Sequence, residues 1–336
     1  GDYARAKLEF EAVLRFENLP PGLREQAQVY DKAANEFLSG KKTVFNGYAE
    51  YGFGYDSNPS SLTKFNPITL TGEDNFIDLP PASRKRSDHY NALVLGGEAV
   101  HTLTEGWTTF LGLDTRGRVY NNVDAADFYS ADGRTGIGYA QGAHNLRLSV
   151  SGGTYWLNDI RTRDSTGESL DYRYLASKTD QVTLGISGTK FAFTPEELKS
   201  NNFRLDQASL GWLHGSNDGR SVYGITALGG VETATGGRAD GDKHFLGGRL
   251  VYQGALTDTV GVFLVGGVQR GKYSQLNAAF NLTRVDTLYD ATLGLTWSFT
   301  KGWSLRPQVV RLRNKSNIPL FEFDRTDASL NVRLDF

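Results

Sequence analysis

A strict alternation of apolar and polar residues runs through the chain from residue 42 to its end, and it limits the fold more than any other feature. The last ten residues show it without a break, in the order Asp327, Ala328, Ser329, Leu330, Asn331, Val332, Arg333, Leu334, Asp335, Phe336. Residues 289–299 repeat the pattern. Successive side chains of a β-strand point to opposite faces, so this period indicates strands with one apolar and one polar face.

The composition fits a sheet that closes on itself in a membrane. The 336 residues include 39 Gly, 19 Phe, 16 Tyr and 5 Trp but only 9 Pro, and the mean hydropathy is −0.40. The richest apolar run, Val260–Val268, is far shorter than the ~18 residues that a membrane-spanning helix needs. A β-barrel crosses a bilayer without such a run, because only alternate residues meet lipid.

The charges and the missing residue types exclude several functions. Basic and acidic side chains number 36 and 38, so the net charge of −2 gives no overall field for nucleic acid. The chain has no Cys, which rules out disulfides, cysteine zinc sites and thiol nucleophiles. Asp240 and Asp242 offer too few oxygens for Ca²⁺. We expect no enzyme, no catalytic residue, no metal and no cofactor; nothing marks a catalytic geometry around His89, His101, His144, His214 or His244.

Short turns and longer polar segments separate the alternating stretches. Two turns, Thr104–Trp107 and Thr300–Trp303, put a tryptophan at the same end of two strands, as in the aromatic girdle of a membrane interface. The segments 59–87 and 160–171 are the longest connections. Short turns on one side and long loops on the other are typical of outer-membrane barrels, whose short turns are periplasmic.

These features predict an all-β fold, an up-and-down antiparallel transmembrane β-barrel of about 14 strands over residues 42–336. Counts of about 12 or 16 remain as alternatives, because single-chain bacterial barrels have even numbers and the sixth strand alternates poorly. The strands are expected at 43–57, 88–104, 107–121, 128–141, 145–158, 170–178, 181–194, 203–214, 221–235, 244–256, 259–273, 284–299, 303–314 and 321–336.

Residues 1–40 carry a helical pattern instead. Two apolar series with spacings of three and four are separated by Pro20-Pro21. The first series, with Tyr3, Ala6 and Phe10, resembles the second helix of a tetratricopeptide repeat. We expect this segment to be the end of a periplasmic helical repeat domain with further repeats before it; a two-helix plug or cap is the alternative.

The polar faces of the strands are expected to line a wet lumen. Their charges have both signs, whereas an ion-selective porin or a polysaccharide exporter more often presents one dominant sign. Mixed charge fits a path that grips a protein weakly or a barrel closed by internal salt bridges; charges that merely fill a narrow barrel are the plainest alternative. The lumen-facing candidates are Glu98, Asp114, Arg116, Arg147, Arg249, Asp290, Arg333 and Asp335.

The two ends of the predicted barrel carry the most specific motifs. The first strand ends in Gly54-Tyr55-Asp56-Ser57-Asn58, and the last hairpin spans 316–326. With a helical repeat in front of a barrel, these segments resemble the surface lipoprotein assembly modulators, the Slam family. First and last strands must pair in a closed barrel, so both motifs are expected at one seam. The seam candidates are Tyr55, Asp56, Ser57, Asn58, Asn317, Pro319, Asp324 and Arg325.

The end of the chain also resembles the signal that the barrel-insertion machinery reads, a terminal Phe on an alternating strand. That signal here consists of Val332, Leu334 and Phe336. It implies the outer membrane of a Gram-negative bacterium, with the N-terminal helices in the periplasm. Expected partners are the insertion machinery, outer-membrane lipids and lipopolysaccharide, whose phosphates suit the basic run 84–86, although a plain solvated loop is the alternative there.

The Slam resemblance implies a function as well as a fold. Members of that family move surface lipoproteins or soluble haem-scavenging proteins across the outer membrane, so a translocated protein is the expected substrate. An exopolysaccharide-export barrel with tetratricopeptide repeats is the first alternative, and a passive porin is the second.

Overall fold

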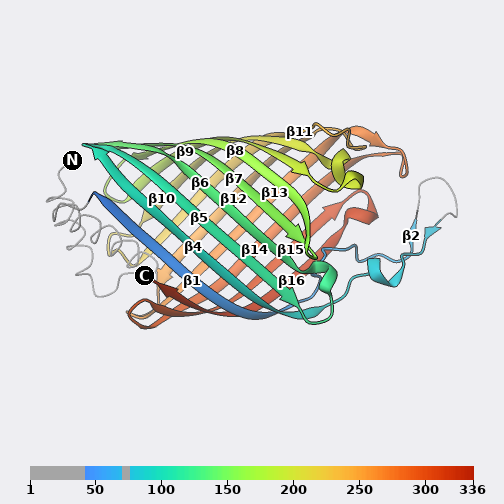
Figure 1. Ribbon diagram of the computed structural model, residues 1–336, viewed down its shortest axis with the longest axis horizontal. Coiled ribbons are helices and arrows are strands. Elements are labelled where there is room, and N and C mark those ends of the chain that lie inside the picture. The colour runs from blue at the N-terminus through green and yellow to red at the C-terminus, as the bar shows by residue number, and fades with distance from the viewer. Residues whose placement is uncertain (1–41, 70–75) are drawn as a thin grey trace.

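The computed structural model describes residues 42–69 and 76–336, and they form one closed antiparallel barrel (Figure 1). Each strand pairs with its neighbours in the chain, and β1 closes the barrel against β16. The predicted count of fourteen strands is confirmed. The barrel strands are β1 (Thr43–Asp56), β4 (Asp88–Thr104), β5 (Trp107–Tyr120), β6 (Phe128–Gln141), β7 (His144–Leu157), β8 (Ile160–Leu175), β9 (Asp180–Phe193), β10 (Phe203–Gly215), β11 (Ser221–Ala234), β12 (Lys243–Ala255), β13 (Val260–Asn277), β14 (Leu282–Thr300), β15 (Trp303–Ser316) and β16 (Phe323–Asp335).

The two ends of the barrel differ. One end, called here the turn end, holds the start of β1 and the C-terminus (Figure 1). It also holds six short connections, the first between β4 and β5 and the last between β14 and β15. The opposite loop end carries the long connection after β1, with the small hairpin of β2 (Ile68–Thr69) and β3 (Phe76–Ile77). It also carries four 3₁₀ turns, η1 (Pro81–Ser83), η2 (Asp124–Ala126), η3 (Glu196–Asn201) and η4 (Pro319–Phe321).

The outer surface is apolar around its middle and aromatic beside the turn end. Leu111 and Leu293 point outward with 65% and 54% of their surface exposed. Trp107 and Trp303 lie at the turn end, as predicted, and the ring centroids of Trp107 and Tyr139 are 4.7 Å apart. Water disfavours so large an exposed apolar band, whereas lipid accommodates it. The barrel therefore crosses a bilayer with this band in the hydrocarbon.

The sixth strand, β8, differs from its prediction. The sequence indicated a polar loop over 160–171 and a short strand at 170–178, but β8 runs from Ile160 to Leu175. A two-residue turn at 158–159 joins it to β7, with φ angles of 48° and 62° that match a type I′ hairpin. The prediction was wrong because the outward positions in the first half of β8 are themselves polar, namely Asp164, Thr166 and Glu168.

The predicted helical repeat over residues 1–40 lies outside the described residues. Among residues 42–69 and 76–336, no helix is both long and apolar enough to span a bilayer.

Candidate functional site at the seam of the barrel

The seam between β1 and β16 is shorter than the opposite joint of β1. Its register runs from the pair Tyr48–Asp335 to the pair Asp56–Asp327. On its other edge β1 pairs with β4 over its whole length, Thr43–Asp56. At the turn end the seam finishes with Gly47 and Phe336, whose backbone N–H groups each donate to the other's carbonyl at 2.9 Å.

The terminal side chain covers the turn end of the seam. A Cβ atom on Gly47 would lie 2.6 Å from the Phe336 ring, so a larger residue at this position would displace that ring. The rings of Phe336 and Phe45 are 6.3 Å apart. Val332 and Leu334 share the outward face of β16 with Phe336, so the three residues expected to form the assembly signal present one apolar row.

A buried carboxylate, Asp56, holds the loop end of the seam. Its side chain is fully buried and accepts hydrogen bonds from Nε of Arg325 at 3.0 Å and from the Tyr120 hydroxyl at 2.9 Å. A second guanidinium nitrogen of Arg325 bonds its other oxygen. The backbone N–H of Asn58 also donates to Asp56, at 2.9 Å. Asp56 thus joins β1, β5 and β16 on the inner face of the barrel.

The register partner of Asp56 is a second carboxylate, Asp327. It accepts hydrogen bonds from Arg118 and from the Tyr90 hydroxyl, both at 2.6 Å. The Arg118 guanidinium also lies 3.8 Å from the centre of the Tyr90 ring. Two adjacent carboxylates repel each other unless cations neutralise them, and the two arginines do so here. We call Asp56, Tyr90, Arg118, Tyr120, Arg325 and Asp327 the seam network.

The chain that follows β1 is tied to the last strand as well. The Ser57 hydroxyl oxygen accepts the backbone N–H of Thr326 at 2.7 Å. The Asn58 amide donates to the carbonyl of Asp324 at 3.1 Å. These two contacts bring the first-strand motif and the last-hairpin motif together across the seam.

The loop after β1 then packs on the last hairpin. The Thr63 hydroxyl donates to the carbonyl of Pro319 at 2.6 Å. Ile68, Phe280 and Ile318 form a buried apolar cluster at the loop end. We call these contacts the loop clamp.

The side chains of Tyr55 and Asn317, two of the eight seam candidates, make no hydrogen bond across the seam among the described residues, although Tyr55 pairs with Ala328 in the strand register. Asn317 bonds β14 instead: its amide accepts the Val285 N–H at 2.8 Å and donates to the carbonyl of Thr283 at 2.9 Å. Tyr55 faces outward, with its ring 5.3 Å from that of His89.

The eight lumen candidates lie in inward-facing rows, and most are paired with one another. Glu98 forms ion pairs with Arg134 at 3.2 Å and with Arg147 at 2.9 Å. Three further pairs are Arg134 with Asp114, Arg249 with Asp290 at 3.3 Å, and Arg333 with Asp335 at 2.7 Å. Arg116 lines a small inner cavity of about 190 Å³ beside Asp132 and Arg163. Such pairing neutralises most of the candidates within the wall itself.

Arg118, Tyr90 and Tyr120 were not predicted from the sequence, and Asp327 was predicted only as one polar residue of the last strand. Arg118 continues the inward row of Asp114 and Arg116, so the period of two contained a signal for its direction. Nothing in the sequence brings it to Asp327, which is 209 residues away.

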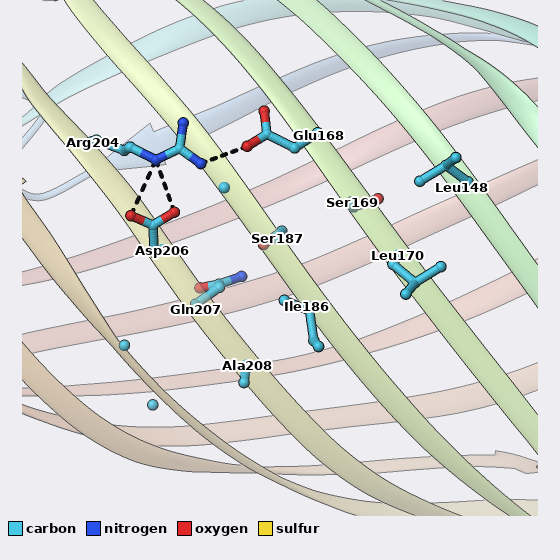
Figure 2. Close-up of a pocket in the computed structure, with 13 residues that line it drawn as sticks. Leu148, Glu168, Ser169, Leu170, Ile186, Ser187, Arg204, Asp206, Gln207 and Ala208 are labelled. Atoms are coloured by element: carbon cyan, nitrogen blue, oxygen red, sulfur yellow. Dashed lines mark hydrogen bonds and ion pairs between the residues drawn. The ribbon is translucent and has the colours of Figure 1, made fainter.

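Charged residues also occur on the outer face. Figure 2 shows Arg204 of β10 between Glu168 of β8 and Asp206, above Leu148, Leu170 and Ile186. Nε of Arg204 lies 2.9 Å from Asp206, and its terminal nitrogen bonds Glu168. The rule that charged residues face the lumen therefore fails towards the loop end.

The other sequence candidates are engaged by the chain itself. Asp240 accepts the Asn277 amide at 2.7 Å and lies 3.3 Å from Arg284, and among the described residues no three His, Asp or Glu are grouped to hold a metal. In the basic run 84–86, Arg84 pairs with Asp78 at 3.0 Å and Lys85 with Asp324 at 2.9 Å.

No protein-family model and no curated protein matches the chain. Several solved structures have a similar barrel. An anion-selective porin from Comamonas acidovorans is 11% identical with a TM-score of 0.47, over 88% of this chain and 99% of the porin. The Pseudomonas putida toluene transporter TodX is 8% identical with a TM-score of 0.45, over 87% of this chain and 90% of the transporter. A bacterial polysaccharide outer membrane secretin is 9% identical with a TM-score of 0.41, over 87% of this chain and 98% of the secretin.

Proposed function

We propose that this chain is an outer-membrane barrel of the Slam type, which assists the passage of surface lipoproteins or secreted haem-scavenging proteins to the cell surface. The seam is its moving part. The observation that carries the proposal is the seam itself, where the two motifs that resemble that family meet in one buried ionic network.

The charges of the lumen argue against an ion-selective path. Glu98, Asp114 and Asp290 are each neutralised by an arginine of the same wall. An ion-selective pore needs a surplus of one sign along its path. Internal pairing instead leaves little charge to select a small ion.

Opening the seam has a defined energetic cost. It exposes the backbone groups of β1 and β16 to hydrocarbon, at several kcal/mol for each unpaired group. An incoming polypeptide offsets this cost by pairing with the freed edges as an added strand. Lateral opening therefore requires a protein substrate, whereas a sugar polymer or a small solute has no strand to offer.

A disulfide across the seam tests this route. Ala49 and Leu334 are register partners on the outer face, and partners in antiparallel strands have Cα atoms about 4.5–5.5 Å apart, within the range of a disulfide. The chain has no native Cys, so Ala49→Cys with Leu334→Cys forms a single defined bond. A surface lipoprotein is co-expressed with the barrel, and its surface exposure is measured by antibody binding to intact cells.

We expect the oxidised seam variant to reduce surface lipoprotein to the level of cells that lack the barrel, and reductant to restore it. The matched control is Leu95→Cys with Thr115→Cys, register partners in the permanent β4–β5 joint, which is expected to have no effect. Normal transport with a locked seam would reject lateral opening. Steady ion conductance of the purified barrel in a planar bilayer would favour the passive porin.

The topology that this proposal needs gives a further prediction. With the turn end in the periplasm, trypsin added to intact cells is expected to cut after Arg86, which is exposed just before β4. Lys301, exposed in the turn between β14 and β15, is the control and is expected to be cut only after the outer membrane is permeabilised. The opposite order of cleavage, read from fragment masses, would invert the topology.

A further inference from the structure

Five basic side chains form an exposed patch on the outer face of β13 and β15, towards the loop end. The register places them in adjacent outward rows around Tyr289 of β14, and they are Arg270, Lys272, Arg311, Arg313 and Lys315. Arg311 has a carboxylate partner, Asp324 at 3.4 Å. Within residues 42–69 and 76–336, the other four have no carboxylate within ion-pair distance.

An apolar groove adjoins this basic patch. It has a volume of about 700 Å³ on the outer face between β11 and β15, and Arg311 and Arg313 line its edge on β15. Leu250 and Val268 contribute its apolar surface. Its floor is open at Gly266, where an added Cβ would meet no atom within 4 Å. A hydrocarbon chain therefore finds both apolar contact and space beside two guanidinium groups.

The outer groove of Figure 2 differs in its charge. It has a volume of about 500 Å³ and similar apolar sides, but its one arginine, Arg204, lies between Glu168 and Asp206. That cation is already neutralised by the chain. Of the two arginines beside β15, Arg313 has no carboxylate partner among the described residues, and Arg311 has one longer contact, to Asp324 at 3.4 Å.

Unpaired cations beside hydrocarbon need anions from outside the chain. A lipid-facing arginine is costly near the midplane of the bilayer and becomes favourable at the interface, where the phosphate groups lie. We infer that this surface binds a phosphorylated, multiply acylated lipid of the outer leaflet, lipid A of lipopolysaccharide. An acyl chain occupies the groove, and the glucosamine phosphates bind Arg311, Arg313 and Arg270. We call this the lipid A site. It rests on the loop end facing outward and not on protein translocation.

The test uses the full chain purified in a neutral detergent and titrated with bisphosphorylated lipid A, with bound lipid counted by native mass spectrometry. Arg311→Ala with Arg313→Ala is expected to weaken binding about tenfold for each arginine removed. Gly266→Phe fills the groove and is expected to weaken binding without removing charge. Phosphate-free lipid A tests whether the phosphates are recognised. Phosphatidylglycerol, which has a phosphate but fewer acyl chains, tests whether the acyl number matters.

Two matched controls complete the design. Arg204→Ala removes a guanidinium that the chain already neutralises, and Gly133→Phe adds a ring on β6, where an added Cβ would meet only backbone oxygens at 3.9 and 4.0 Å. Both are expected to bind lipid A as the native chain does. All variants are first checked for the folded, heat-modifiable band on a gel.

Four results would each overturn the inference. These are unchanged binding by the double arginine variant, unchanged binding by Gly266→Phe, equal losses in the controls, and phosphatidylglycerol or phosphate-free lipid A binding as tightly as the bisphosphorylated form. None of them affects the seam experiment, so this inference and the proposed function fail separately.

Discussion

Replacing Asp56 with alanine is expected to lower the free energy of unfolding of the barrel by about 3–5 kcal/mol, because it leaves the largely buried Arg325 with Asp327, at 3.9 Å, as its only carboxylate partner among the described residues. The loss also removes the acceptor of the Tyr120 hydroxyl and of the Asn58 backbone N–H. Denaturant unfolding of the barrel in micelles, followed by tryptophan fluorescence, measures the change.

An exposed ion pair of the same barrel gives the control. Arg161 and Asp164 lie 2.7 Å apart with 54% and 35% of their side chains exposed. Removing such a pair costs about 1 kcal/mol or less. Asp56→Asn keeps the shape and loses only the charge, so its value is expected between the two. An Asp56→Ala variant as stable as Asp164→Ala would show that the seam network does not hold the barrel closed.

Leu293→Arg is expected to cost about 2–4 kcal/mol and to reduce the folded barrel recovered from membranes, whereas Thr292→Arg is expected to cost little. Leu293 is 54% exposed and lies midway between Tyr289 and Trp297 in one outward row of β14. An arginine there enters the hydrocarbon. Thr292 faces inward, where an arginine stays out of the hydrocarbon.

The heat-modifiable gel band measures folded barrel for both variants at equal expression. Because the two positions are adjacent in the chain, the pair controls for strand propensity and for expression. Equal recovery of the two variants would show that the inward and outward assignment is wrong.

The period of two predicts the parts of the strands that cross the lipid band, because the lipid enforces the alternation only there. Within that band a polar outward residue is costly, so apolar and polar positions separate cleanly. Beyond it the constraint is lost, and the first half of β8, with Glu168 facing outward, was mistaken for a loop. The same loss explains why outward cations such as Arg313 were not foreseen.

The candidate site was predictable in part, and the reason is geometric. Asp56 and Arg325 lie in motifs at the two ends of the barrel, so strand pairing alone brings them close. Arg118 reaches Asp327 from β5, although β1 and β4 lie between their strands. That approach depends on the curvature of the closed wall, which a pattern along one strand does not contain.

The contacts between the segment after β1 and the last hairpin have a consequence for the order of folding. Asn58 and the carbonyl that it binds in Asp324 are 266 residues apart, and Thr63 and Pro319 are 256 apart. Contacts of such high order form late, because the intervening chain must first be in place. The edge of β1 that pairs with β16 thus stays open until the thirteen later barrel strands are in place. Protection of the 57–69 segment from proteolysis therefore reports that the barrel has closed.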